Sequence, residues 1–263
     1  MDPQFLRRVA EALEQGAAAV LVTVVEVEGA APREPGARML VLPEGRVEGT
    51  VGGGALEHRA IARALALLRE GPRTLLETYD LRDLGMLCGG RTTLFYEVLR
   101  APPTLAIFGA GHVGALLARL ARAATPWRIL LVDDRPAHLA DLPPGVAGHL
   151  APDYRPLPPL SGTVYAVVAT ESHETDYRVV RSLLGGEPAP AYVGMLGSRA
   201  KAAEIRQRLQ AEGVSPERAA ALRCPVGLPL GGKDPGAVAV SILAELLAFH
   251  HGRLGPAHAA LAP

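Results

Sequence analysis

The pattern with the most specific chemistry is Gly109-Ala110-Gly111-His112-Val113-Gly114, which follows a strand-like run and opens a helix-like one. At such a turn, Gly109 and Gly111 let backbone N–H groups approach a pyrophosphate, and Gly114 lets the helix pack closely on the strand. The helix N-terminus adds partial positive charge. The pattern predicts a dinucleotide-binding turn, and the alternative is a tight turn without a ligand.

Two charged residues end the next strand-like run. Asp133, 19 residues past Gly114, is placed to accept hydrogen bonds from a ribose. Arg135 is placed to receive a 2′-phosphate, so both NAD and NADP remain open.

A second glycine cluster, at residues 49–54, also precedes a helix-like run. We expect Gly52, Gly53 and Gly54 to present unblocked backbone N–H donors to an anion such as phosphate. Arg33 and Arg38 lie close by in the sequence and are candidates to reinforce this site by bidentate contacts. The alternative is a loop that only needs positive φ values.

Cys88 stands in a third glycine-rich segment, beside Gly89 and Gly90. A thiol between flexible glycines is open to close approach by a ligand or a soft metal. Composition alone favours a small buried side chain instead, and the same holds for Cys224. Neither cysteine has a second Cys or His at a metal-ligand spacing, so no zinc site is predicted.

His173 follows a strand-like run in the segment Glu171-Ser172-His173-Glu174-Thr175. At the carboxyl end of a parallel strand it is positioned to act as an acid or base. The alternative is a helix start capped by Thr175 or Ser172, with His173 exposed and without a role.

In the first half of the chain, hydrophobic periodicity predicts an α+β domain that carries these glycine segments. Helices are expected over Pro3–Gln15 and Ala55–Arg69, and strands over Ala19–Val27, Arg38–Leu42, Arg46–Glu48, Thr74–Tyr79 and Thr92–Leu99. The prolines of Arg100–Pro103 indicate a linker. We therefore expect one domain at residues 1–100 and a second at 104–263.

In the second half, strands and helices alternate, which is typical of a parallel sheet with helices on its faces. Strands are expected over Thr104–Phe108, Arg128–Val132, Thr163–Val168 and Ala191–Val193, and helices over His112–Ala123, Asp176–Leu184, Arg199–Ala211 and Pro235–His251. Leu142–Leu160 is a proline-rich crossover with no assigned conformation. The predicted fold class is α/β, an α+β domain followed by a Rossmann-like domain.

Composition excludes several classes of function. The chain has 263 residues, 27 basic and 27 acidic, so it lacks the positive field that binds phosphate backbones, and nucleic acid is not an expected partner. No apolar run approaches the length of a membrane span, and the first residues do not look like a signal peptide. A cytoplasmic location is expected.

The ordered set of motifs resembles the xanthine dehydrogenase accessory factors, the XdhC/CoxI family. The resemblance is carried by the segments 32–41, 48–54 and 85–90 in the first half, and by 108–114, 132–135, 193–198 and 224–228 in the second. It covers the chain from about Val20 to Phe249.

The resemblance implies a chaperone, more readily than an enzyme, that binds the molybdenum cofactor (molybdopterin) and protects it. Such a protein supports sulfuration of the cofactor by a cysteine desulfurase and hands it to a xanthine dehydrogenase-type apo-molybdoenzyme. Cys88 would be a thiolate ligand, a sulfur relay or a molybdenum contact, and a homodimer is implied.

The sequence departs from the family at Pro229–Lys233 and in part at Glu171–His173. Two alternatives therefore stay open. One is an NAD(P)-dependent oxidoreductase with His173 as proton donor to a small substrate. The other is a nucleotide-sensing module that regulates a partner without turnover.

Overall fold

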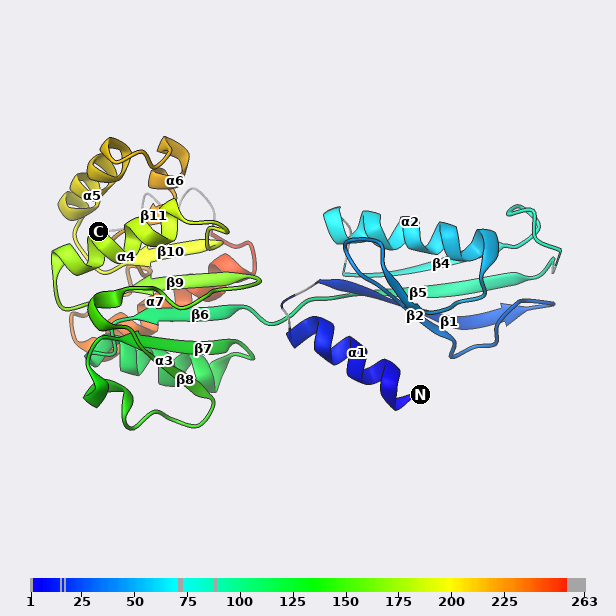
Figure 1. The fold of residues 1–263 in the computed structure, drawn as a ribbon, viewed down its shortest axis with the longest axis horizontal. Helices are drawn as coiled ribbons and strands as arrows, with labels where there is room; N and C mark the ends of the chain where they lie inside the picture. The colour runs from blue at the N-terminus through cyan, green and yellow to red at the C-terminus, as the bar shows by residue number, and fades with distance from the viewer. Residues whose placement is uncertain (1, 15, 17, 71–72, 88, 255–263) are drawn as a thin grey trace. The chain divides into compact units, whose positions relative to one another are not determined.

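The structure is a computed structural model that describes residues 2–14, 16, 18–70, 73–87 and 89–254. The chain divides into two compact units, Met1–Ala101 and Pro102–Pro263 (Figure 1). The first has an antiparallel sheet and the second a parallel one, which confirms the predicted α/β class.

The first unit is an antiparallel sheet with a helix on each face. Its elements are α1 (Pro3–Glu14), β1 (Ala19–Glu28), β2 (Arg38–Val41), β3 (Val47–Gly49), α2 (Gly54–Glu70), β4 (Thr74–Asp80) and β5 (Arg91–Leu99). The strand order is β3-β2-β1-β5-β4.

Alternation along β2 explains how both helices are held. Met39 and Val41 belong to the cluster that α2 covers, whereas Leu40 packs with Ala12 of α1. Because neighbouring residues of a strand point to opposite faces, α1 and α2 lie on opposite faces of the sheet.

The second unit is a six-stranded parallel sheet in the order β11-β10-β9-β6-β7-β8. Its elements are β6 (Thr104–Phe108), α3 (His112–Ala124), β7 (Arg128–Asp133), η1 (Pro136–Leu139), β8 (Val146–Leu150), η2 (Pro152–Tyr154), β9 (Val164–Val168), α4 (His173–Gly185), β10 (Tyr192–Met195), α5 (Arg199–Ala211), α6 (Pro216–Ala220), β11 (Leu222–Arg223) and α7 (Pro235–His250).

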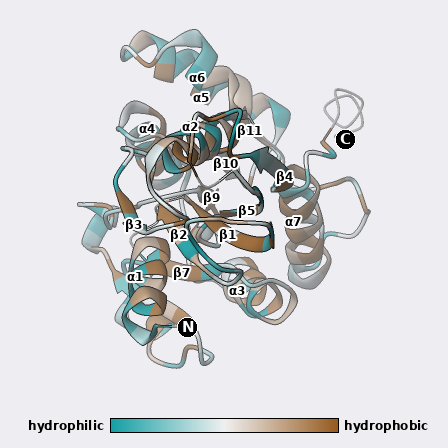
Figure 2. Cartoon of the chain, turned by 90° about the vertical axis from the view of Figure 1, so that its right-hand side faces the viewer, coloured by the Kyte–Doolittle hydropathy of each residue, from teal (hydrophilic) through white to brown (hydrophobic). Residues whose placement is uncertain are grey.

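Two apolar clusters hold the helices on the two faces of this sheet. Leu183 of α4 and Ile205 of α5 belong to one cluster, and Leu117 of α3 and Ile242 of α7 belong to the other. Figure 2 shows α7 on the hydrophobic side of the scale over most of its length, in keeping with this packing. No helix in the described part of the chain is long and apolar enough to cross a membrane.

The predicted elements are present, and the described residues add five short ones, including the 3-10 helices η1 and η2. The crossover at Leu142–Leu160 contains the edge strand β8, and α6 and β11 were not predicted. The helix predicted from Asp176 begins at His173, because Ser172 caps it. Ser198 caps α5 and Asp234 caps α7: each side chain accepts a hydrogen bond from an amide in the first turn.

Candidate functional site

In the first unit, three glycine-bearing segments far apart in sequence lie together. The Gly90 amide donates to the Ala30 carbonyl at 3.1 Å. A Cβ added at Gly52 would lie 2.5 Å from the Pro32 ring, and one added at Gly54 would lie 4.0 Å from Cε of Met86. Segments 29–36, 49–54 and 85–90 therefore meet at one place, which a shared ligand site requires.

The amides of the second glycine cluster are not the free donors that the sequence suggested. Gly52 donates to the Thr50 hydroxyl at 3.1 Å, and Gly53 donates to the Glu57 carboxylate at 3.2 Å. The Thr50 hydroxyl donates to the same Glu57 oxygen. Glu57 lies in the first turn of α2, where a carboxylate is favoured. An anion at these two amides would therefore have to displace both the Thr50 hydroxyl and the Glu57 carboxylate.

Three arginines are the candidate anion-binding side chains of this region. The Arg38 carbonyl accepts the Thr50 amide at 2.9 Å, so the backbone of Arg38 adjoins the glycine cluster, whereas alternation along β2 places its side chain on the face of Leu40 and α1. Its Nε is buried and has no acceptor among the described residues. Arg33 is exposed on the neighbouring segment. Arg82, which the sequence did not single out, lies over Gly89: an added Cβ there would be 3.2 Å from its Nε.

Cys88 lies outside the described residues, so its predicted contact with a ligand or metal stays a prediction. Gly90, two residues further on, is buried, and an added Cβ there would lie 2.4 Å from the Ala30 carbonyl oxygen. Gly90 also accepts the Leu81 amide at 2.9 Å. Among the described residues, no group of three His, Cys, Asp or Glu side chains is arranged to hold a metal ion.

In the second unit, the predicted dinucleotide turn lies where the strand order reverses. The chain runs outward from β6 to β7 and β8, and then returns to β9 on the other side of β6. The turns after β6 and β9 therefore lie side by side at the carboxyl edge of the sheet, where ligands of open parallel sheets bind. The Ala169 amide donates to Phe108 O at 2.8 Å across this point.

The three glycines of this turn have different roles. Gly109 has a φ of +111°, and an added Cβ would lie 2.1 Å from the Ala169 carbonyl oxygen. An added Cβ at Gly114 would lie 1.8 Å from the Gly109 carbonyl oxygen. Gly111 has open space beside it and begins α3 without a side-chain cap. Gly109 and Gly114 thus serve packing, whereas Gly111 leaves the helix N-terminus accessible.

The side chain of Asp133 is buried and hydrogen-bonded to other groups of the protein. It has no exposed surface, and its carboxylate accepts hydrogen bonds from the Ala110 amide at 2.6 Å and from Nε of Arg135 at 2.8 Å. Burial alone would raise the pKa of Asp133, but these bonds outweigh it and hold that pKa well below its usual range. In this arrangement, contact between Asp133 and a ribose, or between Arg135 and a 2′-phosphate, would require Arg135 to turn away.

Two residues beside this pair were missed by the sequence analysis. Oδ1 of Asp134 and the Tyr154 hydroxyl are buried and have no hydrogen-bond partner in the described part of the chain. Burial, aided by the charges of Glu171 and Asp133, raises the pKa of Asp134. Tyr154 has a φ of +54°, which is unusual for a residue with a side chain. The sequence contains no sign of this positive φ, which only the folded backbone shows.

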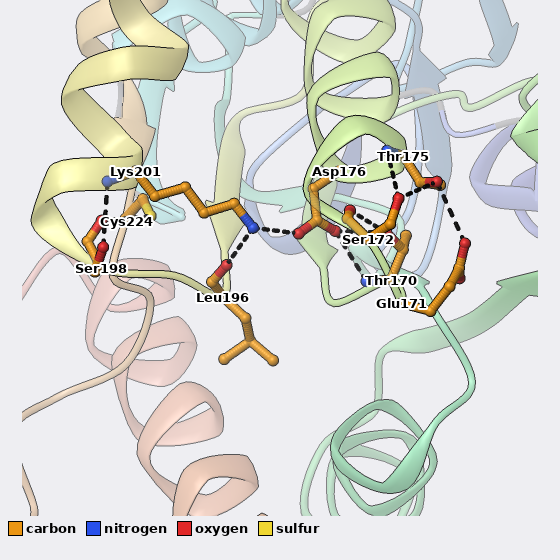
Figure 3. Close-up of polar contacts among 9 residues, drawn as sticks. All are labelled: Thr170, Glu171, Ser172, Thr175, Asp176, Leu196, Ser198, Lys201 and Cys224. Atoms are coloured by element: carbon orange, nitrogen blue, oxygen red, sulfur yellow. Dashed lines mark hydrogen bonds and ion pairs between the residues drawn. The ribbon is translucent and has the colours of Figure 1, made fainter.

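A buried ion pair connects the turns after β9 and β10, as Figure 3 shows. Nζ of Lys201 lies 2.6 Å from Oδ2 of Asp176. Oδ1 of the same carboxylate accepts the Thr170 amide at 3.0 Å and the Thr170 hydroxyl at 2.6 Å. Lys201 also donates to the Leu196 carbonyl at 3.5 Å. The pair therefore fixes the turn that carries the predicted His173.

His173 itself is exposed in the first turn of α4. The Ser172 hydroxyl accepts the Thr175 amide at 3.1 Å, so Ser172 is the cap. This confirms the Ser172 alternative for the helix start. A catalytic role for His173 stays a prediction.

Two models of protein families match the chain. The model described as the XdhC Rossmann domain matches residues 105–246, and the model described as the XdhC and CoxI family matches residues 12–80. The two matches fall in the second and the first unit, respectively.

Three curated proteins are similar over most of the chain. "Uncharacterized protein YqeB" of Escherichia coli (strain K12) is 31% identical over 89% of this chain and 44% of its own length. "Molybdenum cofactor insertion chaperone PaoD" of the same strain is 28% identical, over 92% and 86%. A probable xanthine dehydrogenase subunit of Bacillus subtilis (strain 168) is 26% identical, over 89% and 94%. The chain thus spans less than half of YqeB and most of the other two.

Proposed function

The chain belongs to the XdhC and CoxI family, and from this premise we propose that it binds the molybdenum cofactor and serves as its chaperone. It protects the cofactor, supports its sulfuration by a cysteine desulfurase and delivers it to a xanthine dehydrogenase-type molybdoenzyme. The name of the relative PaoD supports this proposal. The observation that carries it is the meeting of segments 29–36, 49–54 and 85–90.

The residues present suit a pterin that bears a phosphate. Arg82 lies beside Gly89, and Arg33 is exposed on segment 29–36. Guanidinium groups bind phosphate through paired charged hydrogen bonds. Since Glu57 occupies the amide of Gly53, the arginines are the main recognition groups for the phosphate in this proposal. Glycine backbones permit close approach of the pterin, and Cys88 supplies a soft thiolate.

For the second unit we propose a dinucleotide of the NAD(P) class at the carboxyl edge. The accessible N-terminus of α3 beside Gly111 supports this assignment, because backbone amides there can receive a pyrophosphate. In this proposal the nucleotide has a regulatory or structural role. Hydride transfer with His173 as proton donor is the competing function.

In this proposal the protein delivers the cofactor in the cytoplasm and docks in turn to the cysteine desulfurase and to the apo-molybdoenzyme. We further propose that it acts as a homodimer. Light scattering during gel filtration measures its mass, and a monomer at micromolar concentration would contradict the dimer. Pull-down with a xanthine dehydrogenase-type apoenzyme and with a cysteine desulfurase measures the two docking steps.

The chaperone proposal is tested by the cofactor content of protein purified from a host that makes molybdopterin. Molybdenum and the fluorescent pterin derivative are measured per protein for the natural chain and for Cys88→Ala, Arg82→Gln and Arg7→Gln. Arg7 lies exposed on α1 and serves as the charge-matched control. We expect Cys88→Ala and Arg82→Gln to reduce retention at least tenfold, and Arg7→Gln to leave it unchanged.

The same preparations are incubated with NADH and NADPH, and thermal shifts are recorded. If the natural protein contained no pterin and transferred hydride from NADH or NADPH to a substrate, the chaperone proposal would be contradicted and the oxidoreductase alternative favoured. Equal pterin retention in all variants would contradict the proposed site.

A further inference from the structure

A separate cavity of about 310 Å³ opens in the second unit at the carboxyl end of β11. Among its lining residues are Arg206 of α5, Arg223 of β11 and Glu245 of α7. Strand β10 lies between β11 and β9, so this cavity is distinct from the carboxyl edge at the β6–β9 reversal. Neither the chaperone proposal nor the dinucleotide proposal uses it.

Arg206 brings donors to the cavity that the protein does not satisfy. One terminal nitrogen donates to the Leu222 carbonyl at 2.7 Å. Nε of Arg206 is buried and, within the described residues, has no acceptor. A guanidinium has five N–H donors, so most of those on Arg206 have no acceptor among the described residues.

Arg223 is held by weaker contacts. Its NH1 lies 3.8 Å from Oε1 of Glu245, which is beyond hydrogen-bond distance. Its guanidinium carbon lies 5.7 Å from the ring centre of Tyr192 and 5.8 Å from that of Phe249. These rings orient the charge by cation–π attraction and leave its N–H groups available.

Glu245 does not neutralise both arginines. Its side chain is almost completely buried. Oε1 accepts the Tyr192 hydroxyl at 2.8 Å, and Oε2 accepts the Gly227 amide at 2.6 Å. The carboxylate is therefore already hydrogen-bonded, and the lining carries two guanidinium groups against one carboxylate.

The rest of the wall is mostly apolar or neutral. Leu222, Pro225, Leu228 and Leu254 line the cavity, together with Cys224. Burial raises the pKa of Cys224 to about 11, so its thiol stays neutral near pH 7 and adds no negative charge. The cavity thus offers cationic donors on one part of its wall and apolar contact on another.

We propose that this cavity binds a small organic oxyanion, a carboxylate or phosphate monoester on a compact apolar group, between Arg206 and Arg223. The oxyanion accepts the N–H donors that lack partners, and the apolar group lies along Leu222 and Leu228. The volume lies at the small end of the range for ligand pockets, about 300–1,000 Å³, so the ligand is a single ring or a short chain. This inference is independent of the proposed chaperone function.

Calorimetric titration with phenyl phosphate and with benzoate tests the proposal, and benzyl alcohol serves as the uncharged probe. The variants are Arg206→Gln and Arg223→Gln. Arg199→Gln is the control, since Arg199 is exposed on the same helix as Arg206 and does not line the cavity. We expect at least one anion to bind at a single site, benzyl alcohol not to bind, and each cavity variant to weaken binding about tenfold or more, as lost charged hydrogen bonds do. Arg199→Gln should bind like the natural chain.

A second readout needs no change at the arginines. In the Cys88→Ala background, Cys224 is the only remaining thiol, and the bound anion should slow its alkylation by iodoacetamide, with half-protection at the calorimetric Kd. Failure of both anions to bind saturably would overturn the proposal. So would equal weakening by Arg199→Gln, equal binding of benzyl alcohol, or saturable binding that leaves Cys224 alkylation unchanged.

Discussion

Nζ of Lys201 lies 2.6 Å from a carboxylate oxygen of Asp176, and the two side chains are only 10% and 5% exposed. Asp176 lies in the first turn of α4, and Lys201 in that of α5. The pair therefore connects two helix starts at the carboxyl edge of the sheet. Since Thr170 also donates to Asp176, the turn after β9 depends on this carboxylate as well.

Lys201→Met should destabilise the second unit by about 3 kcal/mol, because it leaves a buried carboxylate without its cation. The chain has one tryptophan, Trp127, which is buried in the second unit. Its fluorescence during unfolding in denaturant therefore reports on that unit. Adding Asp176→Asn should recover most of the loss, because Asn can still accept the Thr170 bonds. An unfolding free energy of Lys201→Met within about 0.5 kcal/mol of that of the natural chain would contradict this prediction.

Gly109→Ala should strongly destabilise the second unit and Gly111→Ala should not, although the two positions lie only two residues apart. At Gly109 the new methyl group would meet the Ala169 carbonyl at 2.1 Å, at a φ of +111°. We expect a loss of about 3 kcal/mol or more there. Gly111 has a φ of −67° and open space, so its variant should stay within about 0.5 kcal/mol. The Tm followed by Trp127 fluorescence measures both, and equal losses would mean that Gly111 is also packed.

Asp133 should make the stability of the second unit depend on pH in acid. Its folded pKa lies below the ordinary value of 3.8, so its contribution is complete above that value and is lost as pH falls below it. Asp133→Asn should cost about 3 kcal/mol at pH 7, and the gap to the natural chain should narrow below about pH 4. Unfolding free energies of the two proteins across this pH range provide the measurement. A constant gap would show that the Asp133 charge is not what stabilises the turn.

Glu57→Gln should have opposite effects on stability and on cofactor retention. The carboxylate accepts the Gly53 amide at 3.2 Å at the start of α2, so its loss should cost about 1 kcal/mol. It also removes a negative charge beside the proposed phosphate site, so retention of the pterin should rise. Glu26→Gln, at an exposed position of β1, is the control with the same change of charge. Reduced retention in Glu57→Gln would indicate that Glu57 itself holds the ligand.

Cys224 should titrate near pH 11 in the Cys88→Ala background. Burial disfavours the thiolate and raises the pKa of Cys224 from 9.0 to about 11. Because the folded value is the higher one, the contribution to stability is complete below pH 9.0 and declines as pH rises toward 11. The ultraviolet absorbance of the thiolate, recorded against pH, gives the midpoint. A midpoint at or below pH 9 would mean that the thiol is solvated.

The sequence by itself determined most elements and the local roles within them. Hydrophobic periodicity and turn residues act within a few positions, so Thr104–Phe108 and Arg199–Ala211 were predicted with the bounds that the structure has. Helix caps such as Ser198 are equally local. Strand β8 escaped prediction because only Val146 of its residues is buried, so it lacks an apolar pattern, and β11 because it has only two residues.

Only the tertiary structure decided how the chemical groups are used. The sequence placed Asp133 near a ribose, but packing buried it against Ala110 and Arg135. The contact of Glu57 with the Gly53 amide, by contrast, is local, because the two residues lie four apart at the start of α2. The physical reason is that burial and hydrogen-bond pairing depend on which segments meet in space, and hydrophobic periodicity does not encode those meetings.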